Sequence, residues 1–455
     1  MDKLIVSVSG VRGIVGKTLT PEIAYEFGCA YGTILAPGTK VVLGRDSRPT
    51  GDLIAQALSK GLCDCGVDVI RLGIVTTPGA ALMTRNLGAA GGIVVTASHN
   101  PSPYNGMKFL QPTGVAIPAS TGMKIKQIWE SKEFTFVEAN RKGEVTFIDS
   151  THDAHQNAVL KHTNTKLIKQ KKFRVVLDSI NGAGCAVTPM LLEKLGCELV
   201  HINAEPTGEF AHTPEPLEEN LTDLCAAVRK HGADIGFAQD PDADRLVIID
   251  EQGNYIGEEF TIALCACFVL SNRRGKIAVN LSTSKMIDDV AKMFNTKVFR
   301  APTGEANVVS MMNINSCIVA GEGNGGIIDP RVISVRDSLV GIAMMLEYLA
   351  QSGKTVSQLA AQLPTYCLEK TKFPCPGEIA PHIIGKVRDK YEGTPFARFN
   401  DKDGLRVDLE NAWVSVRASN TEPIMRIFAE APTSQQALTL ISEVKKLADE
   451  IIASA

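Results

Sequence analysis

Short apolar runs and longer amphipathic segments alternate along most of the chain. Three of the runs end in polar residues and read as buried strands, at residues 41–46, 175–179 and 277–282. Helical spacing follows each of them, at residues 51–65, 187–195 and 284–294, with starts at or near Pro49, Pro189 and Ser282. Strands that alternate with helices are typical of βαβ units, so the pattern predicts three related α/β units with mixed, mainly parallel sheets.

The pattern changes after residue 364. Several prolines are followed by an alternating apolar run at residues 413–416 and a long amphipathic helix at residues 434–453. We expect a smaller α+β domain at the C-terminal end. Two segments look like crossings between units: the polar stretch 131–170, which holds three histidines, and the turn-forming stretch 251–254.

Composition and charge favour a small-molecule partner. The chain has 455 residues and a net charge of −3, which gives no electrostatic reason to bind nucleic acid or an anionic membrane. Its eleven cysteines are odd in number and scattered, which indicates neither a disulfide framework nor a zinc site and fits a reducing cytoplasm. The longest apolar run, residues 260–270, is too short to span a bilayer. We therefore expect a soluble, cytoplasmic protein.

The serine loop, residues 96–101, follows a strand-like run and reads Thr-Ala-Ser-His-Asn-Pro. Pro101 favours an extended residue before it, which would present the Ser98 hydroxyl at the carboxyl edge of the sheet, where ligands bind. A serine needs an activating group to act as a nucleophile, and neighbouring His99 would usually point the other way. Ser98 can equally cap a turn. Lys108, expected on the next strand, is either a surface lysine or an ammonium that stabilises a phosphoryl group.

The aspartate loop, residues 240–245, places Asp240, Asp242 and Asp244 at every second position between two strand-like runs. Three converging carboxylates supply the hard oxygen ligands that suit Mg²⁺, and Ser98 could supply another. A calcium-binding helix-loop-helix would put Glu251 at position 12 but Arg245 where glycine is required, and its flanks read as strands. A solvated acidic turn is the other alternative.

Two further loops and one arginine could bind a polar ligand. The glycine loop, residues 321–326, would let the backbone approach a ligand, while Glu322 and Asn324 could hydrogen-bond to sugar hydroxyls; a structural bend is the alternative. The phosphate loop, residues 417–423, clusters the donors that a phosphate dianion needs, and its alternative is a capped turn. These donors are Arg417, Ser419, Asn420 and Thr421. Arg12 is another candidate for an anion contact.

The four loops, in this order, resemble the α-D-phosphohexomutase superfamily over essentially the whole chain. The resemblance implies four domains around a central cleft, which we place at residues 1–148, 149–252, 253–366 and 367–455. It also implies a phosphoserine enzyme with one Mg²⁺ per chain, which moves phosphate between positions 1 and 6 of a hexose through a bisphosphosugar intermediate.

The resemblance also implies roles for single residues. Ser98 matches the phosphoserine, and the three aspartates, together with Ser98, match the metal ligands. The other catalytic positions would be Arg12, Lys108, His99 and Arg245. The substrate-binding positions would be Glu322, Asn324, Arg417, Ser419, Asn420, Thr421 and Arg426.

The chain departs from the family pattern at two places. Many bacterial members have a histidine at the end of the glycine loop, where this chain has Gly326, so Lys108 or the phosphate of the substrate would have to carry the proton. Glu305 stands where some relatives carry a lysine or arginine. This difference weakens the inference from the family pattern about which sugar the chain binds. The glycine-loop sequence resembles the phosphoglucosamine mutase branch, which favours glucosamine 6-phosphate, with mannose and glucose phosphates as rivals.

Two other classes of function stay open on the sequence. A metal-assisted sugar phosphatase would use water in place of the second sugar hydroxyl, and a non-catalytic sensor would bind sugar phosphates without turnover. Release of free phosphate identifies the phosphatase, and insensitivity to loss of Ser98 identifies the sensor. We expect a monomer or a homodimer.

Overall fold

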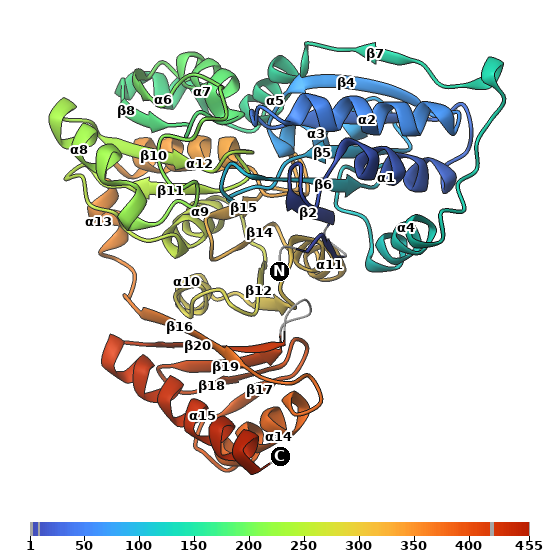
Figure 1. Cartoon of the computed structure of the whole chain (residues 1–455). Coiled ribbons are helices and arrows are strands. Elements are labelled where there is room, and N and C mark those ends of the chain that lie inside the picture. Colours follow the sequence, from blue (N-terminus) through green and yellow to red (C-terminus); the bar gives the residue numbers. More distant parts are fainter. Residues whose placement is uncertain (1–2, 8–9, 419–422, 455) are drawn as a thin grey trace.

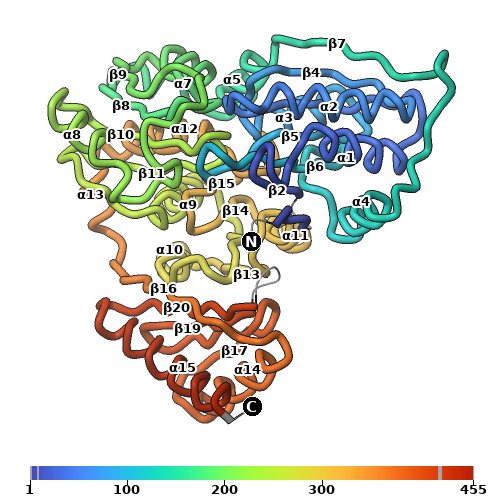
Figure 2. Tube along the Cα trace, viewed as in Figure 1, coloured from blue at the N-terminus to red at the C-terminus, as the bar shows by residue number. Residues whose placement is uncertain are grey.

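The computed structural model describes residues 3–7, 10–418 and 423–454. Its strands form four sheets, and we number each sheet with its helices as units one to four in chain order (Figure 1). The colour gradient in Figure 2 passes through the units in this order, and the red fourth unit projects from the other three. The predicted class, three α/β units and a smaller α+β domain, is confirmed.

Units one to three share one strand arrangement. In each, the first of four strands lies between the second and third and parallel to both, and the fourth is antiparallel to the third. In unit one these strands are β3 (Lys40–Arg45), β4 (Asp68–Ile74), β5 (Gly91–Val95) and β6 (Tyr104–Leu110). In unit two they are β8 (Arg174–Asp178), β9 (Glu198–Ile202), β10 (Ile235–Gln239) and β11 (Leu246–Ile249). In unit three they are β12 (Ile277–Asn280), β13 (Val298–Ala301), β14 (Val319–Glu322) and β15 (Gly326–Ile328).

Helices connect and cover these strands, which is why the central strands are apolar along their whole length. Unit one has α1 (Pro21–Thr33), α2 (Gly51–Asp64), α3 (Thr77–Asn86) and α4 (Ala119–Ser131). Unit two has α5 (Thr151–Leu160), α6 (Thr165–Lys171), α7 (Gly184–Lys194) and α8 (Thr222–His231). Unit three has α9 (Glu259–Asn272), α10 (Met286–Met293), α11 (Glu305–Asn315), α12 (Ser338–Ser352) and α13 (Val356–Ala360).

Two expectations about these elements need correction. Pro189 lies inside α7 and does not start it, because the helix begins at Gly184. The segment 131–170 is not only a crossing: it contains α5, α6 and the strand β7 (Val145–Phe147), which pairs with β4 at the edge of the first sheet. The three residues of β7 are exposed, and a run this short is not enough to predict a strand from the sequence. At the other edge, β1 (Ile5–Ser7) and β2 (Gly10–Ile14) extend the sheet beyond β6.

Unit four is an antiparallel sheet in the order β16-β20-β19-β18-β17. Its strands are β16 (Cys367–Pro374), β17 (Arg398–Asn400), β18 (Leu405–Asp408), β19 (Trp413–Ala418) and β20 (Ile424–Ala431). Helices α14 (Ala380–Tyr391) and α15 (Ser434–Ser454) accompany it. The predicted strand at 413–416 and the predicted helix at 434–453 are both confirmed.

Buried polar groups fasten unit four to unit three. The Arg406 guanidinium lies 4.0 Å from the centre of the Trp413 ring and donates to the backbone carbonyls of Leu281 and Thr283. The backbone N–H of Lys285 donates to the Glu430 carboxylate over 2.7 Å. These contacts hold the sheet of unit four against unit three in one orientation. Within the residues described, no helix has both the length and the apolar character needed to cross a membrane.

Phe237 tests the packing that positions the aspartate loop, because it is fully buried in β10, two residues before the strand ends. We expect Phe237→Ala to destabilise unit two by about 3–5 kcal/mol, as truncation of a buried aromatic side chain leaves a cavity. Urea unfolding followed by circular dichroism measures the change. Phe147→Ala, at a ring that is 71% exposed, is the control and should change little. An equal loss of stability in the two variants would contradict the claim that Phe237 is part of the packed core of unit two.

Candidate active site

Three of the loops singled out in the sequence occupy equivalent places in the fold. The serine loop lies between β5 and β6, the aspartate loop between β10 and β11, and the glycine loop between β14 and β15. In each unit this is the turn from the third strand into the antiparallel fourth strand. Ligands bind at the carboxyl ends of parallel strands, so the repeated topology presents three chemically different loops at corresponding sheet edges.

Ser98 is buried and held in an unusual backbone conformation. Its φ angle is 49°, in the left-handed region that is costly for residues other than glycine, and its side chain lies next to the aspartate loop. The hydroxyl donates to Oδ2 of Asp240 over 2.9 Å, and the backbone N–H donates to Oγ1 of Thr96 over 2.9 Å. Ser98 is 2% exposed. The structure therefore brings Ser98 together with the aspartates.

The guanidinium of Arg48 holds the serine loop in place. It is fully buried and donates to four backbone carbonyls, at distances of 2.7 to 3.0 Å. These belong to Ser98, Asn100, Pro101 and Tyr104. Its charge is balanced by Asp46, 3.0 Å away, and the ring of Phe210 lies 4.8 Å from the guanidinium carbon. The sequence analysis did not single out Arg48; the polar residues that end the strand at 41–46 were the only local signal.

The three aspartates of the aspartate loop converge, as predicted. They are buried, and one carboxylate oxygen from each lies within 4.8 Å of the others. Oδ1 of Asp240 accepts the backbone N–H groups of Asp244 and Arg245, which shapes the loop. The Lys108 ammonium from β6 lies 2.6 Å from Oδ2 of Asp242 and 3.2 Å from Oδ2 of Asp244.

The remaining oxygens of this cluster suit a metal ion. Oδ1 of Asp242 and Oδ1 of Asp244 are buried and have no hydrogen-bond partner among the residues described. Burial and the two neighbouring carboxylates raise the pKa of Asp240 well above its ordinary value. A buried anionic group normally needs a partner, so the cluster has room and charge for a cation bound by hard oxygen ligands. The three aspartates could hold a metal ion here.

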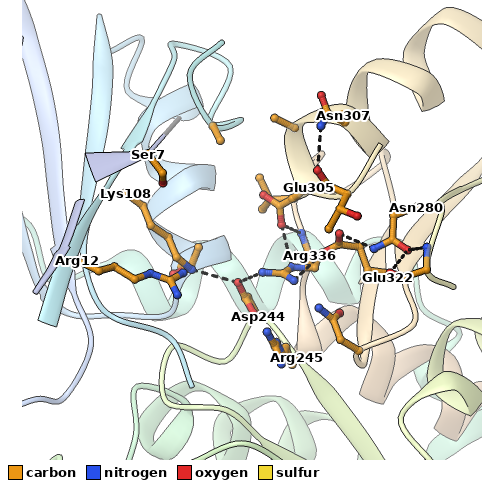
Figure 3. A pocket seen from close by; sticks show the side chains of 18 of the residues that line it. Ser7, Arg12, Lys108, Asp244, Arg245, Asn280, Glu305, Asn307, Glu322 and Arg336 are labelled. Carbon is orange, nitrogen blue, oxygen red and sulfur yellow. Dashed lines mark hydrogen bonds and ion pairs between the residues drawn. The ribbon is translucent and has the colours of Figure 1, made fainter. Parts of the chain in front are cut away.

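Arg336 links the aspartate loop to the glycine loop. Its guanidinium lies 2.7 Å from Oδ2 of Asp244, 2.7 Å from Oε2 of Glu322 and 3.2 Å from Oε2 of Glu305 (Figure 3). Glu322 also accepts a hydrogen bond from the Asn280 amide over 2.8 Å. The sequence analysis missed Arg336 because it lies in a loop without a recognisable motif, 92 residues from Asp244.

A cavity of about 910 Å³ opens between the units and is lined by residues from all four. Among the predicted site residues, the lining includes Arg12, Lys108, Asp244, Arg245, Glu322, Asn324, Arg417 and Arg426. Figure 3 shows Arg12 and Lys108 on one side of Asp244, and Arg336 and Glu322 on the other. The predicted central cleft is therefore present. Arg417 is positioned by Asp403, whose carboxylate lies 3.1 Å away, whereas Ser419, Asn420 and Thr421 lie outside the residues that the structure describes.

Lys108 and His99, two of the predicted catalytic residues, differ in their electrostatic surroundings. Burial alone would lower the pKa of Lys108, but Asp242 and Asp244 outweigh it and raise this pKa above its ordinary value, so the ammonium stays charged. Burial, with help from Arg245 and Arg12, lowers the pKa of His99 to about 3, so this imidazole is neutral at neutral pH. Lys108 is therefore better suited to stabilising charge than to accepting a proton.

Comparison with known protein families agrees with this geometry. Models of the phosphoglucomutase/phosphomannomutase family match four consecutive segments: alpha/beta/alpha domain I at residues 3–136, domain II at 153–253, domain III at 258–366 and the C-terminal domain at 372–447. The chain belongs to the phosphoglucomutase/phosphomannomutase family. Its members are phosphohexomutases, so the chain is an isomerase of this class.

Individual relatives of this family match nearly the whole chain. A "Phosphoglucomutase/phosphomannomutase" of Thermococcus kodakarensis is 39% identical, with 97% of this chain and 98% of the relative covered. A "Probable phosphoglucosamine mutase" of Methanopyrus kandleri is 35% identical at the same coverage. The crystal structure of a phosphoglucomutase/phosphomannomutase family protein from Burkholderia thailandensis is 27% identical, covers 99% of both chains and has a TM-score of 0.85.

Arg48 should control turnover through the position of Ser98. Arg48→Lys keeps the charge beside Asp46, but an ammonium cannot hold four separated carbonyls, so we expect kcat to fall about 100-fold or more. Mutase assays of the wild type and of Arg48→Lys measure the change in kcat. Thermal unfolding of the same two proteins shows whether the variant is still folded. Arg388→Lys, at an exposed pair with Asp401, is the control and should behave like the wild type. Normal turnover in Arg48→Lys would contradict the role of Arg48 in the serine loop.

Arg336 should be needed for stability, because three carboxylates share its charge. We expect Arg336→Met to destabilise the protein by about 3–5 kcal/mol, since it leaves buried charges unpaired. Arg174→Met removes an exposed pair with Glu198 and should cost at most about 1 kcal/mol. Chemical unfolding of the two variants provides the test, and a loss in Arg336→Met as small as in the control would refute the linking role.

Proposed function

We propose that the chain interconverts hexose 6-phosphate and hexose 1-phosphate through a phosphoserine at residue 98 and a bisphosphosugar intermediate, and that glucosamine 6-phosphate is its preferred substrate. The observation that carries the proposal is the junction of Ser98 with the aspartate cluster: a buried hydroxyl lies 2.9 Å from Asp240, and Asp244 of the same cluster lines the cavity together with Lys108 and several arginines. Phosphomannomutase or phosphoglucomutase activity is the alternative.

In the proposed reaction, the phosphoryl group on Ser98 passes to a free hydroxyl of the bound sugar phosphate. The bisphosphosugar then reverses its orientation in the cavity, and its other phosphoryl group is transferred back to the Ser98 oxygen. Lys108 and Arg12 would stabilise the charge on the transferring group, with Arg245 nearby. Arg417 and Arg426, with the phosphate loop, would hold the phosphate that does not react, which keeps the sugar aligned.

Asp240, Asp242 and Asp244 would hold Mg²⁺, which supplies positive charge to the oxygens of the phosphoryl group when bound. The two carboxylate oxygens without hydrogen-bond partners support this role. We propose Ser98 as a further ligand, because its hydroxyl already lies beside Asp240.

Glu322 and Asn324 would read the sugar, because both line the cavity on the glycine loop. Glu305 forms an ion pair with Arg336, and this holds the guanidinium that pairs with Glu322. The raised pKa of Lys108 disfavours it as the proton carrier, which leaves the phosphate of the substrate as the better of the two predicted candidates. Sugar phosphates are the proposed partners. A cytoplasmic location, the monomeric or homodimeric state and the domain boundaries stay predictions.

A coupled assay tests the proposal directly. Purified protein with Mg²⁺ and a trace of bisphosphosugar should convert glucosamine 6-phosphate to the 1-phosphate faster than the glucose and mannose 6-phosphates. Ser98→Ala should abolish this conversion, because the phosphoryl carrier is gone. Ser131→Ala, at an exposed helix end, is the matched control and should keep full activity. Accumulation of free phosphate without 1-phosphate would instead support a phosphatase, and binding without turnover would support a sensor.

A further inference from the structure

A second carboxylate lies against the glycine loop. Glu259 is the first residue of α9, lines the cavity and packs directly on Gly323. A Cβ built on Gly323 would lie 2.0 Å from an Oε atom of Glu259, so any larger residue between Glu322 and Asn324 would have to displace this carboxylate. This close approach places the Glu259 carboxylate at the surface that reads the sugar.

The Glu259 carboxylate has a hydrogen-bond donor but lacks an ion-pair partner in the part of the chain that the structure describes. One carboxylate oxygen accepts the backbone N–H of Ser284 over 2.9 Å, and within the described part of the chain no ion pair joins Glu259 to a lysine or arginine. Lys370 is the nearby cation, and it pairs with Glu258 at 3.4 Å. The start of α9 contributes only the partial positive charge of a helix N-terminus.

The other acidic groups around Glu259 increase its need for a cation. Burial raises the pKa of Glu259 well above its ordinary value, and Glu430 and Glu258 add to this effect. Glu322 differs, because Arg336 and the Asn280 amide already satisfy its two oxygens. Asn324 adds a buried side-chain oxygen that has no hydrogen-bond partner among the described residues. This side of the glycine loop therefore offers hydrogen-bond acceptors and a carboxyl group whose ionised form a bound cation would stabilise.

We propose that Glu259 is a specificity-determining residue that binds the ammonium group of a 2-amino sugar phosphate. An ammonium carries three donors and no acceptor, which matches the unpaired carboxylate oxygen of Glu259 and the unpaired amide oxygen of Asn324. A 2-hydroxyl carries no charge to balance the carboxylate, so glucose and mannose phosphates gain less from this contact. The inference rests on the proposed mutase function and gives its sugar preference a physical cause.

The test compares kcat/KM for glucosamine 6-phosphate and glucose 6-phosphate in the wild type and in Glu259→Gln. Gln keeps the acceptor for the Ser284 N–H but loses the charge. A hydrogen bond to a charged group contributes about 1.5–3 kcal/mol, so we expect kcat/KM for glucosamine 6-phosphate to fall about 10- to 100-fold. The value for glucose 6-phosphate should stay within about twofold. Glu259→Asp, which keeps the charge, should recover part of the preference.

The outcomes separate this inference from the proposed function. Glu130→Gln, on the exposed face of α4, is the control and should change neither substrate. Equal losses on both sugars in Glu259→Gln would show that Glu259 only supports the glycine loop and would overturn the inference. A wild type that prefers glucose 6-phosphate, with Ser98-dependent turnover, would also overturn it but leave the mutase intact. Absence of Ser98-dependent turnover on every sugar would overturn the proposed function itself.

Discussion

The balance of charge around three buried carboxylates is the constraint on which this site depends. Asp240, Asp242 and Asp244 lie too close together to stay ionised without cations. Arg245 lies in the aspartate loop itself, but the two cations that form ion pairs with the aspartates come from other units: Lys108 from unit one and Arg336 from the loop that precedes α12 in unit three. The ion pairs that stabilise the aspartates of unit two therefore connect three units at one point. Any movement that separated them would expose unpaired charge in a poorly solvated site.

The repeated topology also brings the loops proposed to carry the chemistry to this point. Units one to three each carry one of the predicted loops between their third and fourth strands, so three copies of one arrangement supply a hydroxyl, a carboxylate cluster and a glycine-rich turn. The antiparallel fourth strand returns the chain at once, which keeps each loop short and its backbone well defined. Arg48 adds a further restraint, because it fixes the serine loop from within unit one.

The sequence predicted features that depend on neighbouring residues and missed those that depend on distant ones. The strands at 41–46, 175–179 and 277–282 were predicted, since buried strands between helices are apolar throughout, and the aspartates were found because their alternate spacing is local. Arg336 and Glu259 carry no such signal: each owes its importance to partners brought near by folding. The exposed strand β7 was missed because it buries no apolar face, and Pro189 misled because proline is common at helix starts.

The distribution of charge in the cavity suits a substrate that must bind in two orientations. Cations line it from unit one at Arg12 and from unit four at Arg417 and Arg426, whereas unit three contributes the acceptors Glu322 and Asn324. A bisphosphosugar has the complementary pattern, with anionic groups at its ends and an uncharged or cationic ring between them. Exchange of its two phosphates leaves that pattern unchanged, so one cavity can hold both orientations.

A carboxylate to one side of the glycine loop breaks this symmetry, because the substituent at position 2 changes place when the sugar turns. On the proposed role of Glu259, the ammonium contact forms fully in only one orientation, and the two half-reactions would then differ in binding free energy.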